Sequence, residues 1–375
     1  MNFGPADHAH MAHALRLAER GLTTTTPNPR VGCVLVRDGA IVGEGWHARA
    51  GQPHAEVHAL RAAGDRARGA TAYVTLEPCS HHGRTPPCAH ALIDAGVTRV
   101  VAAMTDPNPQ VSGRGIQLLT LAGIHAEVGL LEAEARELNI GFVARMTRGR
   151  PWLRLKTAAS LDGRTALANG ASQWITGPAA RADVQHWRAR ACAILTGIGT
   201  VLADDPRMNV RLAGTTRQPL RVIVDSRLQT PAMARMLPAP ASGGAAGGVG
   251  DSVLIACAAA DPARRAALEA AGAEVIELPG PAGRVGLTAL LNELARRGIN
   301  EVHAEAGATL NGALLDAGLV DEWVAYQAPI VLGHAARGLF EMPPLTDMVG
   351  RRDFVLHDVR KVGADLRAVL RPAVV

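Results

Sequence analysis

Lysine and aromatic residues are scarce in this sequence. Only two of its 39 basic residues are lysines, Lys156 and Lys361, so arginines spread along 375 residues carry nearly all the positive charge. Aromatic residues make up 3% of the chain, which argues against a stacking surface for single-stranded nucleic acid. Scattered arginines and a formal net charge of +5 are explained by general composition or by pairing with carboxylates and phosphates, and they fit a small anionic substrate equally well.

Long apolar runs and paired cysteines are also missing. No window approaches the roughly 18 continuous apolar residues of a membrane span. The first twenty residues lack the basic start and apolar stretch of a signal peptide, so we expect a cytoplasmic protein without a membrane partner. An odd, sparse set of cysteines favours metal binding or burial over disulfides. The five are Cys33, Cys79, Cys88, Cys192 and Cys257.

The first part of the chain has the strand and helix pattern of an α/β domain. Two strands around an Asp38-Gly39 turn are followed by alternating helices and strands, as in a layered sheet. The predicted helices span residues 6–20, 55–63, 88–95 and 116–122, and the predicted strands 31–36, 41–46, 72–76 and 100–103.

Residues 146–151 read M-T-R-G-R-P and predict a domain boundary, because they combine Arg, Gly and Pro without periodicity. We therefore expect domains at 1–147 and 151–375. Residues 238–250 are rich in Gly and Ala and predict a flexible loop inside the second domain. Strands are predicted at 153–158, 193–197, 220–224, 252–257, 273–278, 301–305, 321–327, 354–362 and 366–370, and helices at 179–190, 262–271, 287–297 and 309–317.

A His-Ala-Glu motif and two cysteines form the strongest chemical signal. His54, Cys79 and Cys88 offer three ligands to a tetrahedral zinc ion and leave the fourth position for water, whose pKa zinc lowers towards neutrality. Glu56, two residues beyond His54, suits a general acid/base that carries a proton from water to a leaving amine. This pattern resembles zinc deaminases, which carry H-x-E and P-C-x-x-C. Here eight residues separate the cysteines, so His81 or His82 could replace Cys88 as a ligand.

Three segments resemble the deaminase domain of the bifunctional riboflavin-biosynthesis deaminase/reductase family. They read T-P-N-P-R-V-G at 26–32, P-H-A-E-V-H-A-L at 53–60 and E-P-C-S-H-H-G-R-T-P-P-C at 77–88. The resemblance implies that His54, Cys79 and Cys88 ligate Zn²⁺ and that Glu56 is the catalytic proton shuttle. It also implies that Asn28 holds the pyrimidine, although a turn-forming role before a proline is an equal alternative from the residues alone.

The second half is similar to the reductase domain of the same family, which has a dihydrofolate-reductase-like α/β fold. The shared segments include L-K-T-A-A-S-L-D-G-R-T at 155–165, S-Q-W-I-T at 172–176 and L-T-G-I-G-T-V-L-A-D-D-P at 195–206. Residues 305–313 also follow a strand and open a helix, where backbone N–H groups can bind phosphate. The first half is correspondingly expected to be a cytidine-deaminase-like α/β/α domain.

Residue by residue, the resemblance assigns the contacts of the second domain. The substrate contacts would be Ser172, Arg188, Met208, Arg211 and Glu305, of which the two arginines could pair with a phosphate. The NADPH contacts would be Ala158, Trp174, Thr200, Asp204, Ser226, Gly307, Ala308, Thr309, Leu310, Asn311, Gly312 and Ala313.

The resulting hypothesis is a two-step enzyme of riboflavin synthesis. A zinc-dependent domain would deaminate 2,5-diamino-6-(5-phosphoribosylamino)pyrimidin-4(3H)-one, and an NADPH-dependent domain would reduce the ribosyl group to a ribityl chain. Similar proteins form homo-oligomers, so we expect a dimer or larger assembly that binds no nucleic acid. One alternative is a nucleoside or RNA deaminase with a fused accessory domain. Another is a structural or regulatory module that binds nucleotide without turnover and is stabilised by a zinc ion with four protein ligands.

Overall fold

The computed structural model describes residues 3–80, 87–109, 111–238 and 252–373. The chain divides into two compact units, Met1–Arg150 and Pro151–Val375. His81, His82 and nearly all of the Gly/Ala-rich segment 238–250 lie outside the described residues. Within the described part of the chain, no helix is both long and apolar enough to cross a membrane.

The first unit contains a five-stranded sheet in the order β2-β1-β3-β4-β5. Strands β2, β1 and β3 pair antiparallel, whereas β3, β4 and β5 are parallel. Its strands are β1 (Gly32–Arg37), β2 (Ala40–Trp46), β3 (Thr71–Val74), β4 (Arg99–Ala102) and β5 (His125–Val128), and its helices α1 (Pro5–Glu19), α2 (Ala55–Ala63), α3 (Cys88–Asp94), α4 (Arg114–Leu121), α5 (Glu132–Leu138) and α6 (Ile140–Arg148), with a short 3₁₀ turn at Gly64–Ala67.

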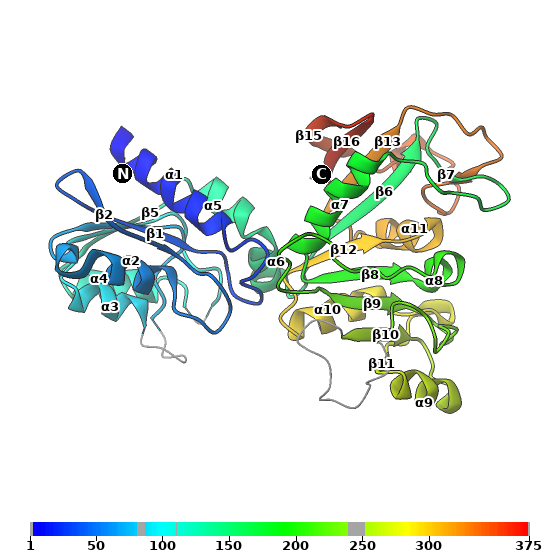
Figure 1. The fold of residues 1–375 in the computed structure, drawn as a ribbon, viewed down its shortest axis with the longest axis horizontal. Helices are drawn as coiled ribbons and strands as arrows, with labels where there is room; N and C mark the ends of the chain where they lie inside the picture. Colours follow the sequence, from blue (N-terminus) through cyan, green and yellow to red (C-terminus); the bar gives the residue numbers. More distant parts are fainter. Residues whose placement is uncertain (1–2, 81–86, 110, 239–251, 374–375) are drawn as a thin grey trace. The chain divides into compact units, whose positions relative to one another are not determined.

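Helices cover both faces of this sheet, which gives an α/β/α sandwich (Figure 1). Alternate residues of β1 point to opposite faces. Cys33 and Leu35 face a core formed with α2, α3 and α4. Val34 and Val36 face a second core formed with α1, α5 and α6. The side of the sheet that carries α2 and α3 is therefore the side that carries the His-Cys-Cys motif.

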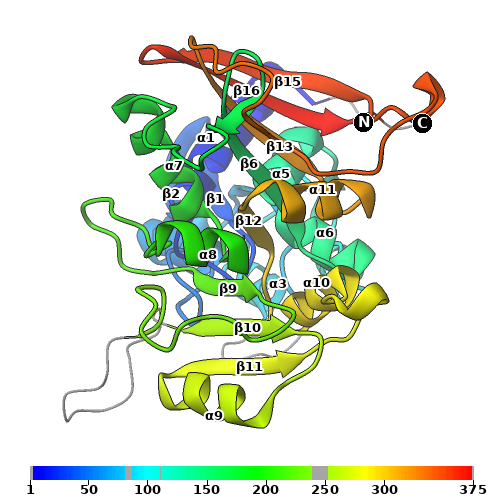
Figure 2. The same ribbon diagram turned by 90° about the vertical axis from the view of Figure 1, so that its right-hand side faces the viewer.

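The second unit contains a nine-stranded sheet in the order β11-β10-β9-β8-β12-β6-β13-β16-β15. The strands from β11 to β13 are parallel, and β16 and β15 close the sheet antiparallel. Figure 2 shows β9, β10 and β11 stacked below the other strands of this unit. The strands are β6 (Trp152–Ser160), β8 (Ala193–Gly197), β9 (Leu220–Val224), β10 (Val253–Cys257), β11 (Ala273–Glu277), β12 (Glu301–Glu305), β13 (Glu322–Ala328), β15 (Phe354–Val362) and β16 (Asp365–Pro372).

Helices cover both faces of the second sheet as well. One core lies between the sheet and α10 and α11, and the opposite face packs against α7, α8 and α9. Because β6, β8, β9, β10 and β12 run parallel, their carboxyl ends meet at one edge, where α/β sheets bind ligands. The helices are α7 (Pro178–Arg190), α8 (Ile198–Asp204), α9 (Pro262–Ala270), α10 (Leu287–Arg296) and α11 (Ala308–Asp316); a separate ladder pairs β7 (Arg164–Ala166) with β14 (Arg337–Gly338), and 3₁₀ turns lie at Pro281–Gly283 and Met348–Gly350.

The predicted elements are all present, with ends that shift by a few residues. The pattern did not reveal β5, α5, α6, β7, α8 or β14. Strand β5 has no fully buried residue and is the edge strand of its sheet, so it lacks the apolar run that marks a buried strand. Helix α8 has seven residues, and Val201 is its one buried residue, so it is too short to show a helical period.

Candidate active sites

The first site lies where two helices begin. His54 is the residue before α2, and Glu56 lies in the first turn of that helix. Cys79 follows β3 in the chain, and Cys88 is the first residue of α3. Segments far apart in the sequence therefore bring these four side chains to one place.

The three predicted ligands converge on one point. His54 Nδ1 lies 3.3 Å from Cys88 Sγ and 3.6 Å from Cys79 Sγ. The three ligand atoms lie within 4.8 Å of one another, and no other such group of three His, Cys, Asp or Glu residues occurs among the described residues. The backbone N–H of Cys88 also donates to Cys79 Sγ at 3.2 Å. The arrangement provides one nitrogen and two sulfur ligands, as a catalytic zinc site requires.

The charges at this site favour a bound cation. Hydrogen bonding from Cys88 and from His54 holds the pKa of Cys79 well below its usual range, so that thiol ionises readily. The hydrogen bond to Cys79 and burial in turn raise the pKa of Cys88. Without a cation, only one of the two thiols ionises readily. A divalent cation bound by both sulfurs would stabilise both thiolates. The residues present therefore fit zinc.

Glu56 lies against the ligands and is not one of them. Its side chain is only 3% exposed, and its Oε2 is a buried atom without a hydrogen-bond partner in the described structure. Burial, reinforced by the negative charge of Cys79, raises the pKa of Glu56 to about 7. A carboxyl group that can gain or lose a proton near neutral pH suits a proton shuttle.

The structure places one further histidine at this site. His47, which directly follows β2, is buried, and its ring packs edge-on against His54 with the ring centroids 5.3 Å apart. Its Nε2 lies 3.1 Å from Asn28 Nδ2, and its Nδ1 lies 3.2 Å from the carbonyl oxygen of Pro53. His47 therefore holds Asn28 beside the cluster. The sequence signal was a histidine at the end of a strand, seven residues before His54.

The second site follows the carboxyl ends of the parallel strands. Of the residues expected to contact NADPH, Thr200 and Asp204 lie on α8 after β8, and Ser226 follows β9. Ala158 lies on β6, and residues 307–313 start α11 after β12. Trp174 lies on the segment between β7 and α7, where it is 68% exposed. Its ring stacks under the guanidinium of Arg181 at 4.4 Å.

The start of α11 is open to a ligand. Gly307 is its N-terminal cap, and a Cβ added there would meet no atom within 4 Å. Free N–H groups and the helix dipole at such a turn favour a phosphate. Gly312 has a different environment, since an added Cβ would lie 2.0 Å from the carbonyl oxygen of Glu341. That glycine allows the 339–341 segment to pack against the helix.

Four of the five expected substrate contacts come together near this edge. Arg188 of α7 forms a bidentate ion pair with Glu305, with Nε–Oε1 at 2.5 Å and Nη2–Oε2 at 3.0 Å. Burial lowers the pKa of Arg188, but the Glu305 charge outweighs it, so the net shift is upward. Lys156 Nζ lies 3.9 Å from the same carboxylate, and burial lowers its pKa. Ser172, the fifth contact, lies half-buried between β7 and α7.

Positive charge is concentrated around this ion pair. Met208 Sδ lies 3.6 Å from Arg188 Nη2, and Arg188 Nη1 donates to the carbonyl oxygen of Asn209. Arg211 donates to the Oδ1 atom of Asn209, an amide rather than a carboxylate. Burial and the positive charge of Arg188 lower the pKa of Arg211. An anionic ligand would relieve this repulsion.

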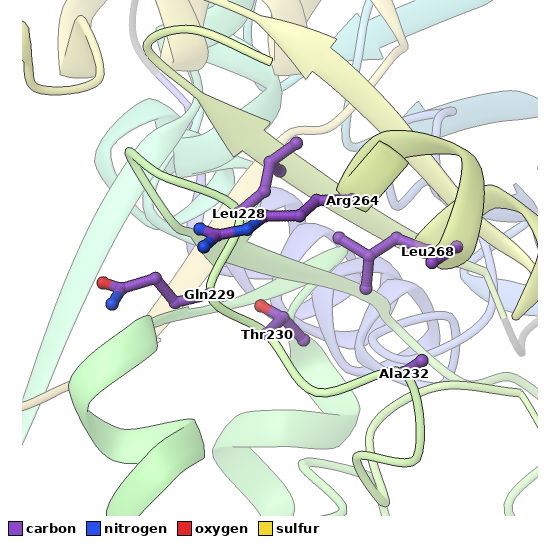
Figure 3. A pocket seen from close by; sticks show the side chains of 7 residues that line it. Leu228, Gln229, Thr230, Ala232, Arg264 and Leu268 are labelled. Atoms are coloured by element: carbon purple, nitrogen blue, oxygen red, sulfur yellow. The ribbon is translucent and has the colours of Figure 1, made fainter. Parts of the chain in front are cut away.

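A separate pocket of about 390 Å³ lies between the loop after β9 and helix α9 (Figure 3). None of its lining residues belongs to the predicted contacts. The first residue that lines this pocket, Leu228, lies two residues after Ser226, at the same carboxyl edge of the sheet. Its lining residues are Leu228, Gln229, Thr230, Ala232, Arg264, Ala267 and Leu268.

Comparisons with known proteins identify the family of each unit. Residues 5–104 match the family model of the cytidine and deoxycytidylate deaminase zinc-binding region, and residues 151–367 match that of the RibD C-terminal domain. The chain is 50% identical to the riboflavin biosynthesis protein RibD of Escherichia coli K12, and the match covers 96% of this chain and 98% of that protein. The chain belongs to the RibD family. The Haemophilus influenzae RibD is 46% identical, with 99% of each chain covered.

Solved RibD structures have the same fold over the whole chain. Acinetobacter baumannii RibD matches with a TM-score of 0.89 and 47% identity, over 98% of this chain and 99% of that one. A deaminase/reductase from Thermotoga maritima matches with a TM-score of 0.83 and 32% identity, over the same shares. The predicted fold class, the riboflavin-pathway assignment and the two enzyme classes, deaminase and reductase, are confirmed. The zinc prediction is confirmed by the matched zinc-binding region and the ligand cluster.

Proposed function

We propose that this RibD-family chain carries out two successive steps on one phosphoribosylated pyrimidine. Residues 1–147 would convert an amino group of 2,5-diamino-6-(5-phosphoribosylamino)pyrimidin-4(3H)-one to a carbonyl oxygen and release ammonia. Residues 151–375 would then reduce the ribosyl group to a ribityl chain with NADPH. The His54–Cys79–Cys88 cluster beside a buried Glu56 carries the proposal, because it supplies a metal site and a proton shuttle together. The Thermotoga maritima relative is described with the same two activities.

In the first step, Glu56 is the residue that moves protons. Zinc, when bound, lowers the pKa of water so that hydroxide is available at neutral pH. Glu56 takes the proton released from water and passes it to the leaving amino group, as a buried carboxyl group beside the ligands can do. Asn28, which is hydrogen-bonded to His47, would hydrogen-bond the pyrimidine.

In the second step, the protein positions two ligands. NADPH supplies the hydride, and the open start of α11 at Gly307 would bind its diphosphate. Arg188 and Arg211 would bind the substrate phosphate, and Glu305 would accept hydrogen bonds from the sugar. The remaining predicted contacts at this edge, among them Ala158, Thr200, Asp204 and Ser226, would hold the cofactor.

Three further expectations accompany this proposal. The chain assembles as a dimer or larger homo-oligomer, which light scattering coupled to size exclusion measures. It works in the cytoplasm, and it binds no nucleic acid. The last expectation separates it from an RNA deaminase, whose binding would weaken steeply with salt.

Zinc depletion tests the division of labour between the two sites. We expect the depleted chain to release no ammonia from the diaminopyrimidine and to oxidise no NADPH with it. The same preparation should still oxidise NADPH when it is given the already deaminated pyrimidine. Ammonia release from single-stranded RNA, but not from the diaminopyrimidine, would favour the RNA deaminase instead.

A further inference from the structure

A second buried glutamate lies next to the zinc ligands, and the proposed mechanism does not use it. Glu77 is two residues before Cys79 and is only 3% exposed. Its backbone N–H donates to the carbonyl oxygen of Met104 at 2.9 Å, just beyond the end of β4. The side chain points away from the ligand cluster, towards the start of α4, as its hydrogen bonds show.

Both carboxylate oxygens of Glu77 accept backbone N–H groups. Oε2 accepts from Asp106 at 3.0 Å and from Gly113 at 2.9 Å. Oε1 accepts from Gly115 at 2.8 Å and from Ile116 at 3.3 Å. A buried carboxylate with four N–H donors has its charge compensated without a cationic side chain.

Three of these donors, from Gly113, Gly115 and Ile116, belong to the N-terminal cap and first turn of α4, whose cap residue offers no side-chain acceptor. Its N-terminal cap is Gly113, which has no side chain, so Glu77 supplies the acceptor that a Ser or Asp would normally supply. The fit is close, because a Cβ added at Gly115 would lie 1.9 Å from the carbonyl oxygen of Pro78. The start of α4 is therefore fixed against the peptide that leads into Cys79.

We infer that Glu77 is a positioning residue for the metal site, which fixes the Cys79 thiolate by anchoring its backbone to the start of α4. This inference rests on the proposed zinc deaminase site. Cys79 is held on its other side by α3, since its carbonyl oxygen accepts the N–H of Ala89 at 3.2 Å and its sulfur accepts the N–H of Cys88. The two helix starts together set the separation of the two sulfur ligands. Partners of this kind orient metal ligands and change metal affinity by about 10- to 100-fold.

Glu77→Gln in the full-length chain tests this role. Glutamine keeps the size of the side chain but presents an NH₂ group to two backbone N–H donors, which breaks half of the anchor. We expect zinc affinity, measured by competition with a chromophoric chelator, to fall by about tenfold or more. The absorption bands of the cobalt-substituted protein should also shift or weaken, because they report the geometry of the thiolate ligands. Oxidation of NADPH with the deaminated pyrimidine should be unchanged.

Glu127→Gln is the matched control. Glu127 is a carboxylate of the same unit on β5, hydrogen-bonded to Arg99 at 2.9 Å and not to the 77–79 segment. We expect this variant to keep its zinc affinity and its cobalt spectrum even if it unfolds at a lower urea concentration than the wild type. A drop in zinc affinity equal to that of Glu77→Gln would overturn the inference, because general destabilisation would then explain both.

Three other results separate the positioning role from the proposed function. Unchanged zinc affinity and cobalt spectrum in Glu77→Gln would refute the positioning role while leaving the proposed function intact. If the wild-type chain itself bound no zinc, the proposed zinc deaminase function would be refuted, and the positioning role of Glu77 with it. Should Glu77→Gln not fold, Gly115→Ala tests the same contact from the helix side with Glu77 retained. Zinc affinity within twofold of the wild type in that variant would again refute the role.

Discussion

Removal of Arg188 should destabilise the second unit by leaving a carboxylate buried without its main partner. Arg188 makes both hydrogen bonds of a bidentate pair with Glu305, at 2.5 and 3.0 Å. Breaking one side of a buried ion pair costs about 3 to 5 kcal/mol. Lys156 remains 3.9 Å from the carboxylate and compensates part of the charge. We therefore expect Arg188→Ala to lower the free energy of unfolding by about 3 kcal/mol, the lower end of that range.

A double variant separates this cost from the loss of binding. Glu305→Gln in the Arg188→Ala background removes the unpaired charge, so about half of the lost stability should return in urea unfolding followed by tryptophan fluorescence. Both variants should raise the KM for the deaminated pyrimidine by at least about tenfold, because the phosphate loses a cationic partner. The Kd for NADPH should stay within about twofold of the wild type. A loss below about 1 kcal/mol in Arg188→Ala, or no recovery in the double variant, would refute the argument.

Three further predictions concern the first unit. Glu56→Gln should abolish ammonia release while zinc content, measured by elemental mass spectrometry, stays the same; loss of zinc would contradict the role of Glu56 as a shuttle that does not ligate. Replacing Cys88 by Ser should lower zinc content and ammonia release together, with NADPH oxidation on the deaminated pyrimidine as the unaffected control. Asp7 is hydrogen-bonded to Arg99 at 2.6 Å and to Tyr73 at 2.7 Å, and the Arg99 hydrogen bond lowers its pKa to about 2. A carboxyl group whose pKa is lowered on folding stabilises the folded state at pH values above its unfolded pKa of about 4. This stabilisation is lost as the pH falls towards 2. Asp7→Asn should thus cost about 1 kcal/mol at pH 7, since solvent reaches both partners, and almost nothing near pH 2; an equal cost at both pH values would exclude this pairing.

The sequence predicted the strands and helices with buried faces, together with the composition of the first site. Helix α2 has the predicted bounds because its start carries His54 and Glu56 and its buried face repeats alanines at 55, 59 and 63. The motif and the family resemblance together predicted that His54, Cys79 and Cys88 meet, although the first and the last are 34 positions apart. The spacing alone left the third ligand open between Cys88, His81 and His82, and the family resemblance selected Cys88.

The missing features depend on contacts between distant segments. The hydrogen bond of His47 to Asn28 spans 19 residues, and the Glu77 anchor reaches residues up to 39 positions away. Neither has a periodic pattern in the sequence, because one side chain packing against a distant loop leaves no repeat. The Arg188–Glu305 pair joins α7 to β12 in the same way, so the sequence could offer both residues as candidates but not their pairing.

Mass spectrometry of the pyrimidine after incubation with zinc-loaded protein tests the two-step function most directly. Without NADPH, we predict a product in which one amino group has become a carbonyl oxygen. With NADPH, we predict the same change plus two hydrogens on the sugar. An unchanged pyrimidine in both samples, with zinc confirmed on the protein, would contradict the proposed function. A reduced product that retains both amino groups would contradict the proposed order of the steps.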